Sequence, residues 1–214
     1  MDLNQLRKEY STTGLEIPDL DLDPFKQFQA WFDLSMKTSP GTWYESNAMT
    51  LATCGKANQP TARTVLLKGI SAAGFEFFSN YESAKGMQLV ENQNASLLFH
   101  WPWLERQVRI EGQATKTSRE RSLEYFHSRP RGAQIGAHAS HQSDVIESRD
   151  VLDVRRIELE KQFEGGPVPL PDNWGGYILE PSRCEFWQGR MDRLHDRIVY
   201  ERQGMAWKLF RIAP

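Results

Sequence analysis

Short runs of β-branched and aromatic residues, separated by polar turns, recur along this 214-residue chain. Such runs are typical of strands. The regular strand–helix–strand alternation of a parallel sheet is missing, which excludes a Rossmann-type sheet. The pattern predicts a mostly-β or α+β fold built on an antiparallel barrel, with strands at residues 48–54, 61–68, 75–79, 95–103, 106–117, 177–180, 183–188, 193–201 and 206–212.

Helical segments interrupt these strands. Asp23 followed by Pro24 is typical of a helix start, because an N-cap acceptor precedes proline at the first helical position. Three phenylalanines from Phe25 to Phe32 then recur at helical spacing and predict core packing rather than an aromatic cofactor box. Further helices are expected at residues 83–91, 118–129 and 150–163, a polar loop at 131–147 and an extended connection at 14–23.

Length and charge limit the classes of protein to consider. The chain fits one domain, residues 1–214, with residues 1–22 as an N-terminal segment. A net charge of −2 gives no reason to expect nucleic-acid binding, and no apolar run approaches the length of a membrane span. Arginines outnumber lysines 17 to 9, and since guanidinium groups hold phosphate in a bidentate manner, this favours anionic ligands.

The cysteines indicate a reducing compartment, and the histidines do not indicate a metal site. Cys54 and Cys184 do not form a Cys-x-x-Cys motif and no apolar leader precedes them, so we expect free thiols and a cytoplasmic location. His138 and His141 have metal-ligand spacing, but no third ligand lies at a useful distance in the sequence. A metal is therefore not expected.

No glycine-rich dinucleotide or phosphate loop occurs in the chain, so any nucleotide must be held by side chains of strands and loops. Arg63 and Lys68 lie at the two ends of an apolar run and, by strict alternation, on opposite faces of a strand. They could belong to one site only if Lys68 lay at a strand end or beyond a bulge. Basic residues that simply flank a core strand are an equally good interpretation. Tyr125 and Arg129 are neighbours on one helix face. They could clamp a phosphate, although an arginine near the negative end of a helix dipole is the simpler interpretation.

The stretch with the densest cluster of candidate site residues runs from residue 185 to residue 197. If residues from Arg193 onward form a strand, Arg193, His195 and Arg197 share one face, while Leu194 and Asp196 take the other. Two guanidiniums and an imidazole repel one another unless an anionic or electron-rich group lies against them. The stretch therefore predicts a binding site; a solvated strand face is the alternative.

This stretch reads Glu185-Phe186-Trp187-Gln188-Gly189, then Arg193-Leu194-His195-Asp196-Arg197, and it resembles the C-terminal signature of the pyridoxamine/pyridoxine 5'-phosphate oxidases. The resemblance extends along nearly the whole chain. Its most specific pieces are residues 63–68, 104–108, 125–130, 142–143, 174–176 and 187–197. It implies a split β-barrel homodimer with FMN at the subunit interface.

The resemblance also implies a role for each matching position. FMN would be bound by Arg63, Thr64, Val65, Leu66, Leu67, Lys68, Phe78, Ser79, Lys85, Gln107, Gln142, Ser143, Trp187 and Arg197. The substrate would contact Arg7, Tyr10, Lys68, Tyr125, Arg129, Arg193, Leu194 and His195. Arg193 and His195 would be the catalytic pair, and the N-terminal segment with Arg7 and Tyr10 would close over the site.

The implied reaction belongs to vitamin B6 metabolism. Pyridoxamine 5'-phosphate or pyridoxine 5'-phosphate would be oxidised to pyridoxal 5'-phosphate, with hydride passing to FMN, dioxygen forming hydrogen peroxide, and the amine releasing ammonia. The sequence departs from the family pattern in three places: Ala84 replaces a usual arginine, Ala133 a frequent serine and Glu45 an aspartate. Losing one charge-assisted contact costs about 1.5–3 kcal/mol if nothing compensates. A related split-barrel flavin reductase and a non-catalytic flavin- or pyridoxal-phosphate-binding protein are the alternatives.

Overall fold

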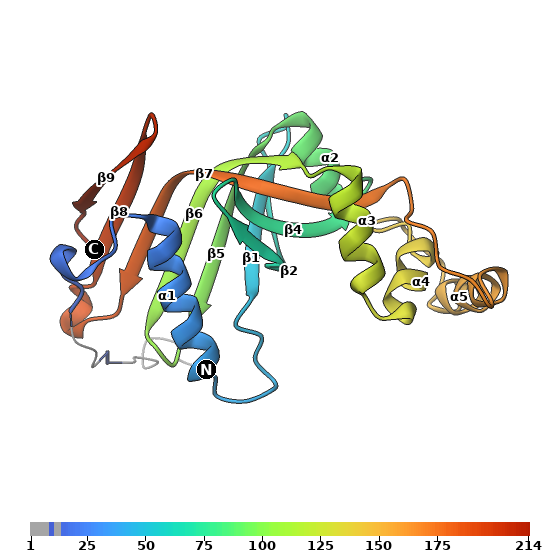
Figure 1. Ribbon diagram of the computed structural model, residues 1–214, viewed down its shortest axis with the longest axis horizontal. Coiled ribbons are helices and arrows are strands. Elements are labelled where there is room, and N and C mark those ends of the chain that lie inside the picture. The colour runs from blue at the N-terminus through green and yellow to red at the C-terminus, as the bar shows by residue number, and fades with distance from the viewer. Residues whose placement is uncertain (1–8, 11–13) are drawn as a thin grey trace.

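The computed structural model describes residues 9–10 and 14–214, and in these residues the chain forms one antiparallel sheet of nine strands with helices around it (Figure 1). The strands are β1 (Ala48–Cys54), β2 (Pro60–Leu66), β3 (Gly69–Ser71), β4 (Gly74–Asn80), β5 (Asn94–Trp101), β6 (Arg106–Lys116), β7 (Trp174–Gln188), β8 (Asp196–Gln203) and β9 (Ala206–Arg211). The helices are η2 (Ile17–Asp19), α1 (Pro24–Lys37), α2 (Ala84–Glu91), α3 (Arg119–Ser128), α4 (Arg131–Ala139), α5 (Asp150–Gln162) and η3 (Met191–Arg193).

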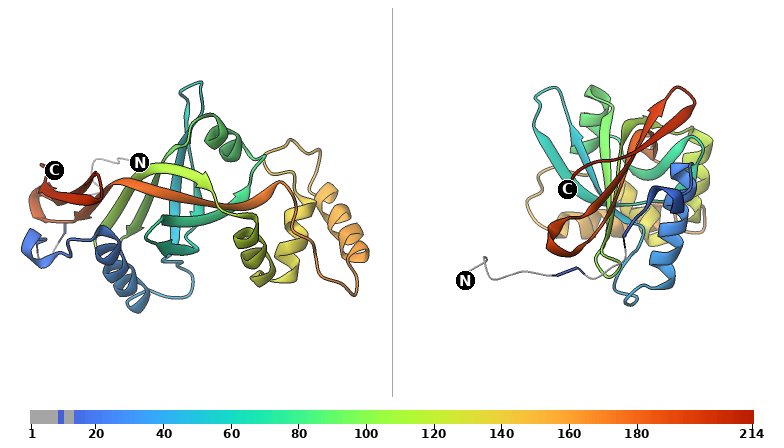
Figure 2. Two further views of the ribbon diagram at one scale, coloured as in Figure 1. Left: turned by 45° about the horizontal axis from the view of Figure 1, so that its top comes forward. Right: turned by 90° about the vertical axis from the view of Figure 1, so that its left-hand side faces the viewer.

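Strand β7 organises the sheet. The strand order is β2-β1-β5-β6-β7-β4-β3, and β7 pairs with β4 through its first half and with β8 through its second half. The sheet curls into a split barrel, with the β8–β9 hairpin at one end of the molecule and α3, α4 and α5 at the other (Figure 2). The predicted antiparallel barrel is thus confirmed.

Helix α1 packs against the curled sheet. It begins as predicted, with the Asp23 carboxylate accepting a hydrogen bond from the Phe25 N–H at 2.9 Å and proline in the first turn. Phe28 is fully buried, and its ring lies 5.0 Å from that of Phe75 and 4.8 Å from that of Phe99. The aromatic stripe is therefore core packing.

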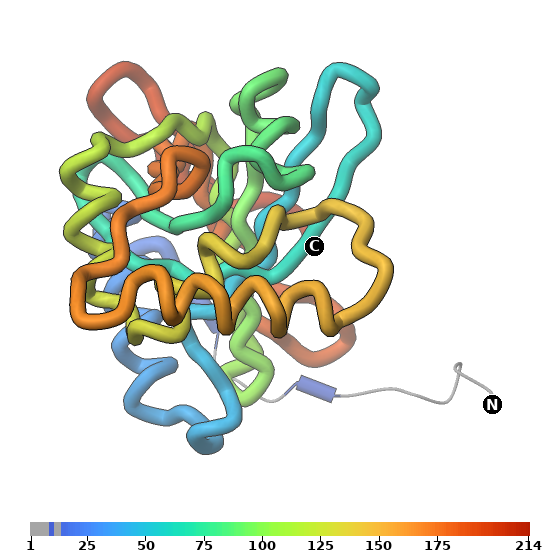
Figure 3. Tube along the Cα trace, turned by 90° about the vertical axis from the view of Figure 1, so that its right-hand side faces the viewer, coloured from blue at the N-terminus to red at the C-terminus, as the bar shows by residue number. Residues whose placement is uncertain are grey.

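A smaller hydrophobic cluster joins the helical end to the sheet. Phe126 of α3, Ile135 of α4 and Trp174 at the start of β7 are its buried members, together with Val168 and Leu170 from the segment before β7. Helix α5 lies across this end beside α4 (Figure 3). The cluster fixes α3 and α4 against β4 and β7, and this position matters for the cavity described below.

Two sequence-based expectations about elements are wrong, in addition to the strand start at Arg193 that is described with the site. Residues 131–147 were expected to be a loop, but residues 131–139 form α4, because burial of Gln134, Ile135 and Ala139 outweighs the low helix propensity of its glycines. The strands expected at 177–180 and 183–188 are one strand. The register shifts opposite Glu111 and Gly112, so a β-bulge accommodates the residues between those two runs.

None of the helices in the described part of the chain has the length and apolar character needed to cross a membrane.

Candidate functional site

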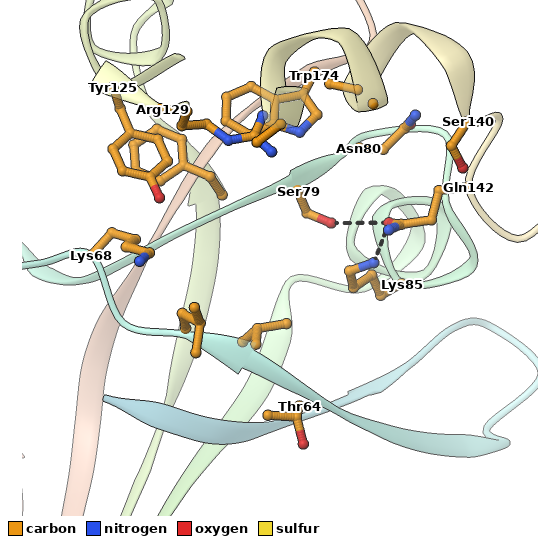
Figure 4. Close-up of a pocket in the computed structure, with 16 residues that line it drawn as sticks. Thr64, Lys68, Ser79, Asn80, Lys85, Tyr125, Arg129, Ser140, Gln142 and Trp174 are labelled. Carbon is orange, nitrogen blue, oxygen red and sulfur yellow. Dashed lines mark hydrogen bonds between the residues drawn. The ribbon is translucent and has the colours of Figure 1, made fainter. Parts of the chain in front are cut away.

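A cavity of about 460 Å³ lies between the sheet and the helical end of the molecule (Figure 4). Strands β2 and β4 supply one side, and α2, α3, α4 and the loop after α4 supply the other. Its walls are formed by Thr64, Val65, Leu66, Lys68, Phe78, Ser79, Asn80, Lys85, Tyr125, Arg129, Ala133, Gly136, Ala137, Ser140, Gln142 and Trp174. The two ends of this cavity differ in their polar groups.

One end is built around the ammonium group of Lys85, the second residue of α2. Lys85 Nζ donates to Gln142 Oε1 at 2.6 Å and to Ser83 Oγ at 3.2 Å, and Ser79 Oγ donates to the same Gln142 oxygen at 3.4 Å (Figure 4). Burial, and secondarily the charge of Arg63, lowers the pKa of Lys85 to about 8. Among the described residues, the hydrogen-bond partners of this buried ammonium are all neutral.

The opposite end holds Lys68, Tyr125 and Arg129 (Figure 4). The Arg129 guanidinium lies over the Trp174 ring at 4.6 Å, and burial lowers its pKa. Among the described residues, Arg129 Nη1 is buried without a hydrogen-bond partner. The Tyr125 ring stacks on Phe78 at 3.9 Å, and Lys68 Nζ lies 6.0 Å from the centre of the Tyr125 ring. The predicted pair of Tyr125 and Arg129 therefore faces the cavity, and Lys68 joins it.

Six of the fourteen residues predicted to bind FMN do not line this cavity, and three of them, Arg63, Leu67 and Ser143, line neither this cavity nor the second pocket described below. Arg63 Nη1 donates to the Leu51 carbonyl at 3.0 Å and to Thr53 Oγ1 at 2.6 Å, which holds it beside the Lys85 end. Leu67 is buried in the main core. Ser143 Oγ accepts from the N–H of Ala84 at 3.2 Å, in the first turn of α2.

A second, separate pocket of about 240 Å³ is lined by four more residues of the predicted set, namely Gln107, Trp187, His195 and Arg197. It is lined by Leu98, Gln107, Arg109, Glu185, Trp187, His195, Arg197 and Pro214. None of these residues lines the larger cavity. Within the described residues, the predicted site residues that line a cavity are therefore divided between two pockets.

His195 presents one defined ring nitrogen to its surroundings. Its Nδ1 accepts a hydrogen bond from the backbone N–H of Arg190 at 3.1 Å, so the neutral ring carries its proton on Nε2. Burial, and secondarily the charge of Arg193, lowers the pKa of His195. The ring lies 4.6 Å from that of Trp187 and 5.2 Å from that of Tyr10. His195 is consequently a hydrogen-bond donor through Nε2.

Arg197 is held by protein groups. Its Nε donates to Glu185 Oε1 at 2.8 Å and its Nη1 to the Ala213 carbonyl at 3.1 Å. The other Glu185 oxygen accepts from Arg109 Nη2 at 2.7 Å. The Glu185 carboxylate raises the pKa of Arg197. A buried carboxylate thus sets the orientation of two guanidiniums at the rim of this pocket.

The prediction that Arg193, His195 and Arg197 share one strand face is wrong for Arg193. Strand β8 begins at Asp196, and Arg193 ends the 3-10 turn η3 with a φ of 61°. This turn leaves Arg193 and Leu194 exposed, so neither lines the pocket. His195 and Arg197 do line it together. The strand could not extend back to Arg193, because Asp192 and Arg193 both have left-handed backbone angles.

The structure describes only part of the N-terminal segment that was predicted to close over the site. Arg7 lies outside the described residues. Tyr10 is described, and its ring packs edge-on against Trp187 at 5.6 Å and against His195. It thus lies beside the second pocket.

Several cavity residues have no counterpart in the sequence-based set. They are Asn80, Gly136, Ala137, Ser140 and Trp174, together with Ala133, which the sequence analysis named only as a departure from the family pattern. Four of them, at positions 133, 136, 137 and 140, follow the spacing of one helix face, and this spacing would have indicated a small-residue wall had α4 been recognised. Trp174 lies in one of the motifs that resemble the family, but the resemblance implied no role for it.

Fold and cavity together define the class of this protein. The curled antiparallel sheet with its flanking helices is a split barrel, and it superposes on the crystal structure of PhzG from Burkholderia lata 383 in complex with tetrahydrophenazine-1-carboxylic acid. That comparison has a TM-score of 0.88 and 29% identity, and covers 97% of this chain and 100% of the other.

Sequence comparison gives the family. The family model described as "Pyridoxamine 5'-phosphate oxidase" matches residues 42–162, and the one described as "Pyridoxine 5'-phosphate oxidase C-terminal dimerisation region" matches residues 174–214. A protein of Aliarcobacter butzleri (strain RM4018) named pyridoxine/pyridoxamine 5'-phosphate oxidase is 52% identical over 100% of both chains. A protein of the same name from Rubrobacter xylanophilus is 50% identical over 100% of this chain and 97% of its own. The chain belongs to the pyridoxamine 5'-phosphate oxidase family.

Proposed function

We propose that this chain oxidises pyridoxamine 5'-phosphate and pyridoxine 5'-phosphate to pyridoxal 5'-phosphate, with FMN as its resident cofactor and dioxygen as the electron acceptor. This reaction serves the synthesis and salvage of the vitamin B6 cofactor. The names of the relatives that match over the full length support the proposal. A charge imbalance in the larger cavity supports it independently.

This imbalance is the observation on which the proposal chiefly rests. Within residues 9–10 and 14–214, none of Arg63, Lys68, Lys85 and Arg129 forms an ion pair with a carboxylate. Arg63, Lys85 and Arg129 are at least partly buried, whereas Lys68 is exposed, and buried charges are normally compensated. Two cations near each end of one cavity suit two phosphates, one belonging to FMN and one to the substrate.

The donor groups fit this division. Lys85, Arg63 and the amide of Gln142 would hold the FMN phosphate, and Lys68, Tyr125 and Arg129 would hold the substrate phosphate. Arg129 Nη1, which has no protein partner among the described residues, would donate to that phosphate. Ala133 lines the cavity without a hydroxyl group, so the hydrogen bond that a serine often makes at this position in the family would be missing here.

We infer that the functional unit is a homodimer whose sites each combine the cavity of one chain with the second pocket of its partner. Gln107, Trp187 and Arg197 would then complete the FMN site, and His195 the substrate site. The division of the set between two pockets in one chain supports this inference, as does the match of residues 174–214 to a dimerisation region.

Bound FMN supplies the chemistry of accepting a hydride and passing electrons to dioxygen, with hydrogen peroxide as product. The phosphate clamp positions the substrate, and Arg193 offsets charge that develops on the pyridine ring as the hydride leaves. His195 donates a hydrogen bond through Nε2 and does not act as a general base, since Nδ1 is already engaged. With the amine substrate, hydrolysis of the oxidised product releases ammonia.

An anaerobic titration tests this function. Adding pyridoxine 5'-phosphate to the purified yellow protein should bleach the flavin absorbance, and admitting air should restore the colour and produce hydrogen peroxide. Pyridoxine without its phosphate is the control and should bleach the flavin poorly. A flavin that bleaches with a reduced nicotinamide but not with the phosphorylated substrate would identify a flavin reductase instead. A flavin that never bleaches would indicate a binding protein.

We further propose that residues 1–214 act as one FMN-binding domain in which the N-terminal segment contributes to the substrate site. The contacts of Tyr10 with Trp187 and His195 support this. The cytoplasmic location expected from the two cysteines stays a prediction.

A further inference from the structure

Asp196 occupies an unusual position between two residues of the proposed site. It is the first residue of β8 and lies between His195 and Arg197, yet its side chain does not line the second pocket. Only 9% of the residue is exposed. A buried carboxylate needs compensating donors, so its partners show what it holds in place.

The carboxylate joins three separate segments. Asp196 Oδ2 accepts from the backbone N–H of Leu15 at 3.0 Å and from Arg190 Nη1 at 3.1 Å, and Oδ1 accepts from Arg211 Nη1 of β9. Burial would raise the pKa of Asp196, but the Leu15 N–H and the guanidiniums of Arg211 and Arg190 outweigh it and lower the pKa. The carboxylate is therefore ionised and fully engaged.

Arg211 fixes the same N-terminal segment from its other side. Its Nη2 donates to the Leu15 carbonyl at 2.6 Å and to Glu16 Oε2 at 3.0 Å. The backbone at Gly14 packs so closely on Arg190 that an added Cβ would overlap Arg190 Nη1. Residues 14–16 are thus fastened to β8 and β9 by both backbone groups of Leu15.

Tyr10 lies shortly before this fastened segment in the sequence. The Tyr10 ring packs against Trp187 and His195, and it lies so close to Gly189 that a Cβ there would overlap the ring. The turn from residue 190 to residue 195 is also tied to Asp196 through Arg190, whose backbone N–H donates to His195. One carboxylate is therefore linked to both sides of the contact between Tyr10 and His195.

We propose that Asp196 is a positioning residue, which holds the Leu15 segment and the Arg190 turn together and thereby places Tyr10 against His195 for substrate binding. This inference rests on the proposed function for the role of Tyr10. Asp196 itself contacts neither of the two pockets. Its effect on turnover passes through Tyr10.

The test compares Asp196→Asn with the matched control Glu16→Gln in the FMN-loaded protein. Asparagine keeps the shape of the side chain but loses the charge that holds the guanidiniums of Arg190 and Arg211. Glu16→Gln removes only the negative charge of the exposed ion pair between Glu16 and Arg211. Without any substrate, amide hydrogen exchange at Leu15 should accelerate by about tenfold or more in Asp196→Asn and little in Glu16→Gln. Unchanged exchange at Leu15 would overturn the proposed fastening, whatever reaction the protein catalyses.

A double-mutant cycle with Tyr10→Ala then separates positioning from general destabilisation. With Tyr10 present, Asp196→Asn should lower kcat/KM about tenfold, mainly through KM, with flavin content unchanged. With Tyr10→Ala, the same substitution should cost less than about twofold. Equal losses in both backgrounds would overturn the proposal.

A second variant tests the proposal even if Asp196→Asn misfolds. Gly14→Ala leaves the carboxylate intact but displaces the flexible end of Arg190 from it. It should reproduce the rise in KM and the same coupling to Tyr10. A wild-type KM in correctly folded Gly14→Ala would contradict the proposal.

Discussion

At the residue scale, Lys85 shows how burial prepares a charge for an anion. Its ammonium has only neutral hydrogen-bond partners among the described residues, and burial with the nearby charge of Arg63 lowers its pKa to about 8. An ammonium attracts phosphate only while it is protonated. The folded protein without ligand therefore carries this charge below pH 8 and loses it as the pH rises through 8, and a bound phosphate shifts the pKa upward again.

We expect FMN affinity to decline above pH 8 and to flatten in Lys85→Arg, because a guanidinium stays protonated throughout this range. Lys85→Gln should weaken FMN binding by about 1.5–3 kcal/mol, the value of one charge-assisted hydrogen bond. The measurement is the FMN dissociation constant from fluorescence quenching on both sides of pH 8. A wild-type constant that does not vary with pH would show that Lys85 does not contact the phosphate.

His195 gives a prediction about one ring nitrogen. Because Nδ1 accepts from Arg190 and Nε2 carries the proton, glutamine can replace the Nε2 donor while asparagine replaces only Nδ1. His195→Asn should lower kcat/KM about ten- to a hundredfold and His195→Gln distinctly less. Both variants should stay yellow. Greater loss in the glutamine variant would mean that Nδ1 is the functional atom.

Arg193 stands in a strained turn rather than on a strand, and its proposed role is electrostatic. Arg193→Ala should lower kcat/KM by about two orders of magnitude, typical for the loss of one preorganised charge, without loss of flavin. Steady-state turnover with pyridoxine 5'-phosphate at saturating FMN measures this, alongside the flavin spectrum. Near-normal turnover in Arg193→Ala would remove it from the site.

At the scale of elements, α4 combines helix formation with the wall of the cavity. Gly132 and Gly136 both lie in this helix, and a Cβ added at either meets no atom within 4 Å. Only Gly136 lines the cavity. Glycine is a weak helix former, so it is retained at a cost in stability, and at position 136 the missing methyl group leaves room for a ligand.

Gly136→Ala and Gly132→Ala should each stabilise the fold by about 0.5–1 kcal/mol, with the smaller gain at Gly132 in the first turn. Gly136→Ala alone should weaken ligand binding, by about 1 kcal/mol or more, because its methyl group intrudes on the occupied cavity. Denaturant unfolding and substrate KM measure the two effects. Equal KM values in the two variants would place the ligands away from α4.

At the scale of the whole molecule, the two pockets lie apart in one chain, and the proposed dimer would unite them. Mixing a Lys85→Gln chain with an Arg197→Ala chain tests this arrangement. If each site combines two chains, every mixed dimer has one site with both residues intact. Random exchange should therefore restore about a quarter of the wild-type flavin capacity. Each variant alone should hold FMN poorly.

Failure of the mixture to regain flavin, under conditions where mass spectrometry shows mixed dimers, would place both pockets of each site in the same chain. Unmixed variants incubated in parallel serve as the control for slow refolding.

The sequence by itself determined the local structure wherever local rules are strong. Asp23 and Pro24 begin α1, Ser83 begins α2, and the strand over residues 48–54 has the predicted bounds. These features depend on neighbouring residues, so they can be recognised without knowledge of the fold. The side chains at both ends of the cavity were also recognisable, because they lie in specific motifs.

Only the tertiary structure decided the rest. Helix α4 forms because Ile135 is buried against α3, and no local rule registers that contact. Arg193 leaves the strand because two left-handed residues make a turn there. The sequence could not show that the predicted residues occupy two pockets, or that Asp196 joins Leu15 to Arg190, since these relations link positions far apart in the chain. Such contacts exist only after the sheet has curled and its ends have met.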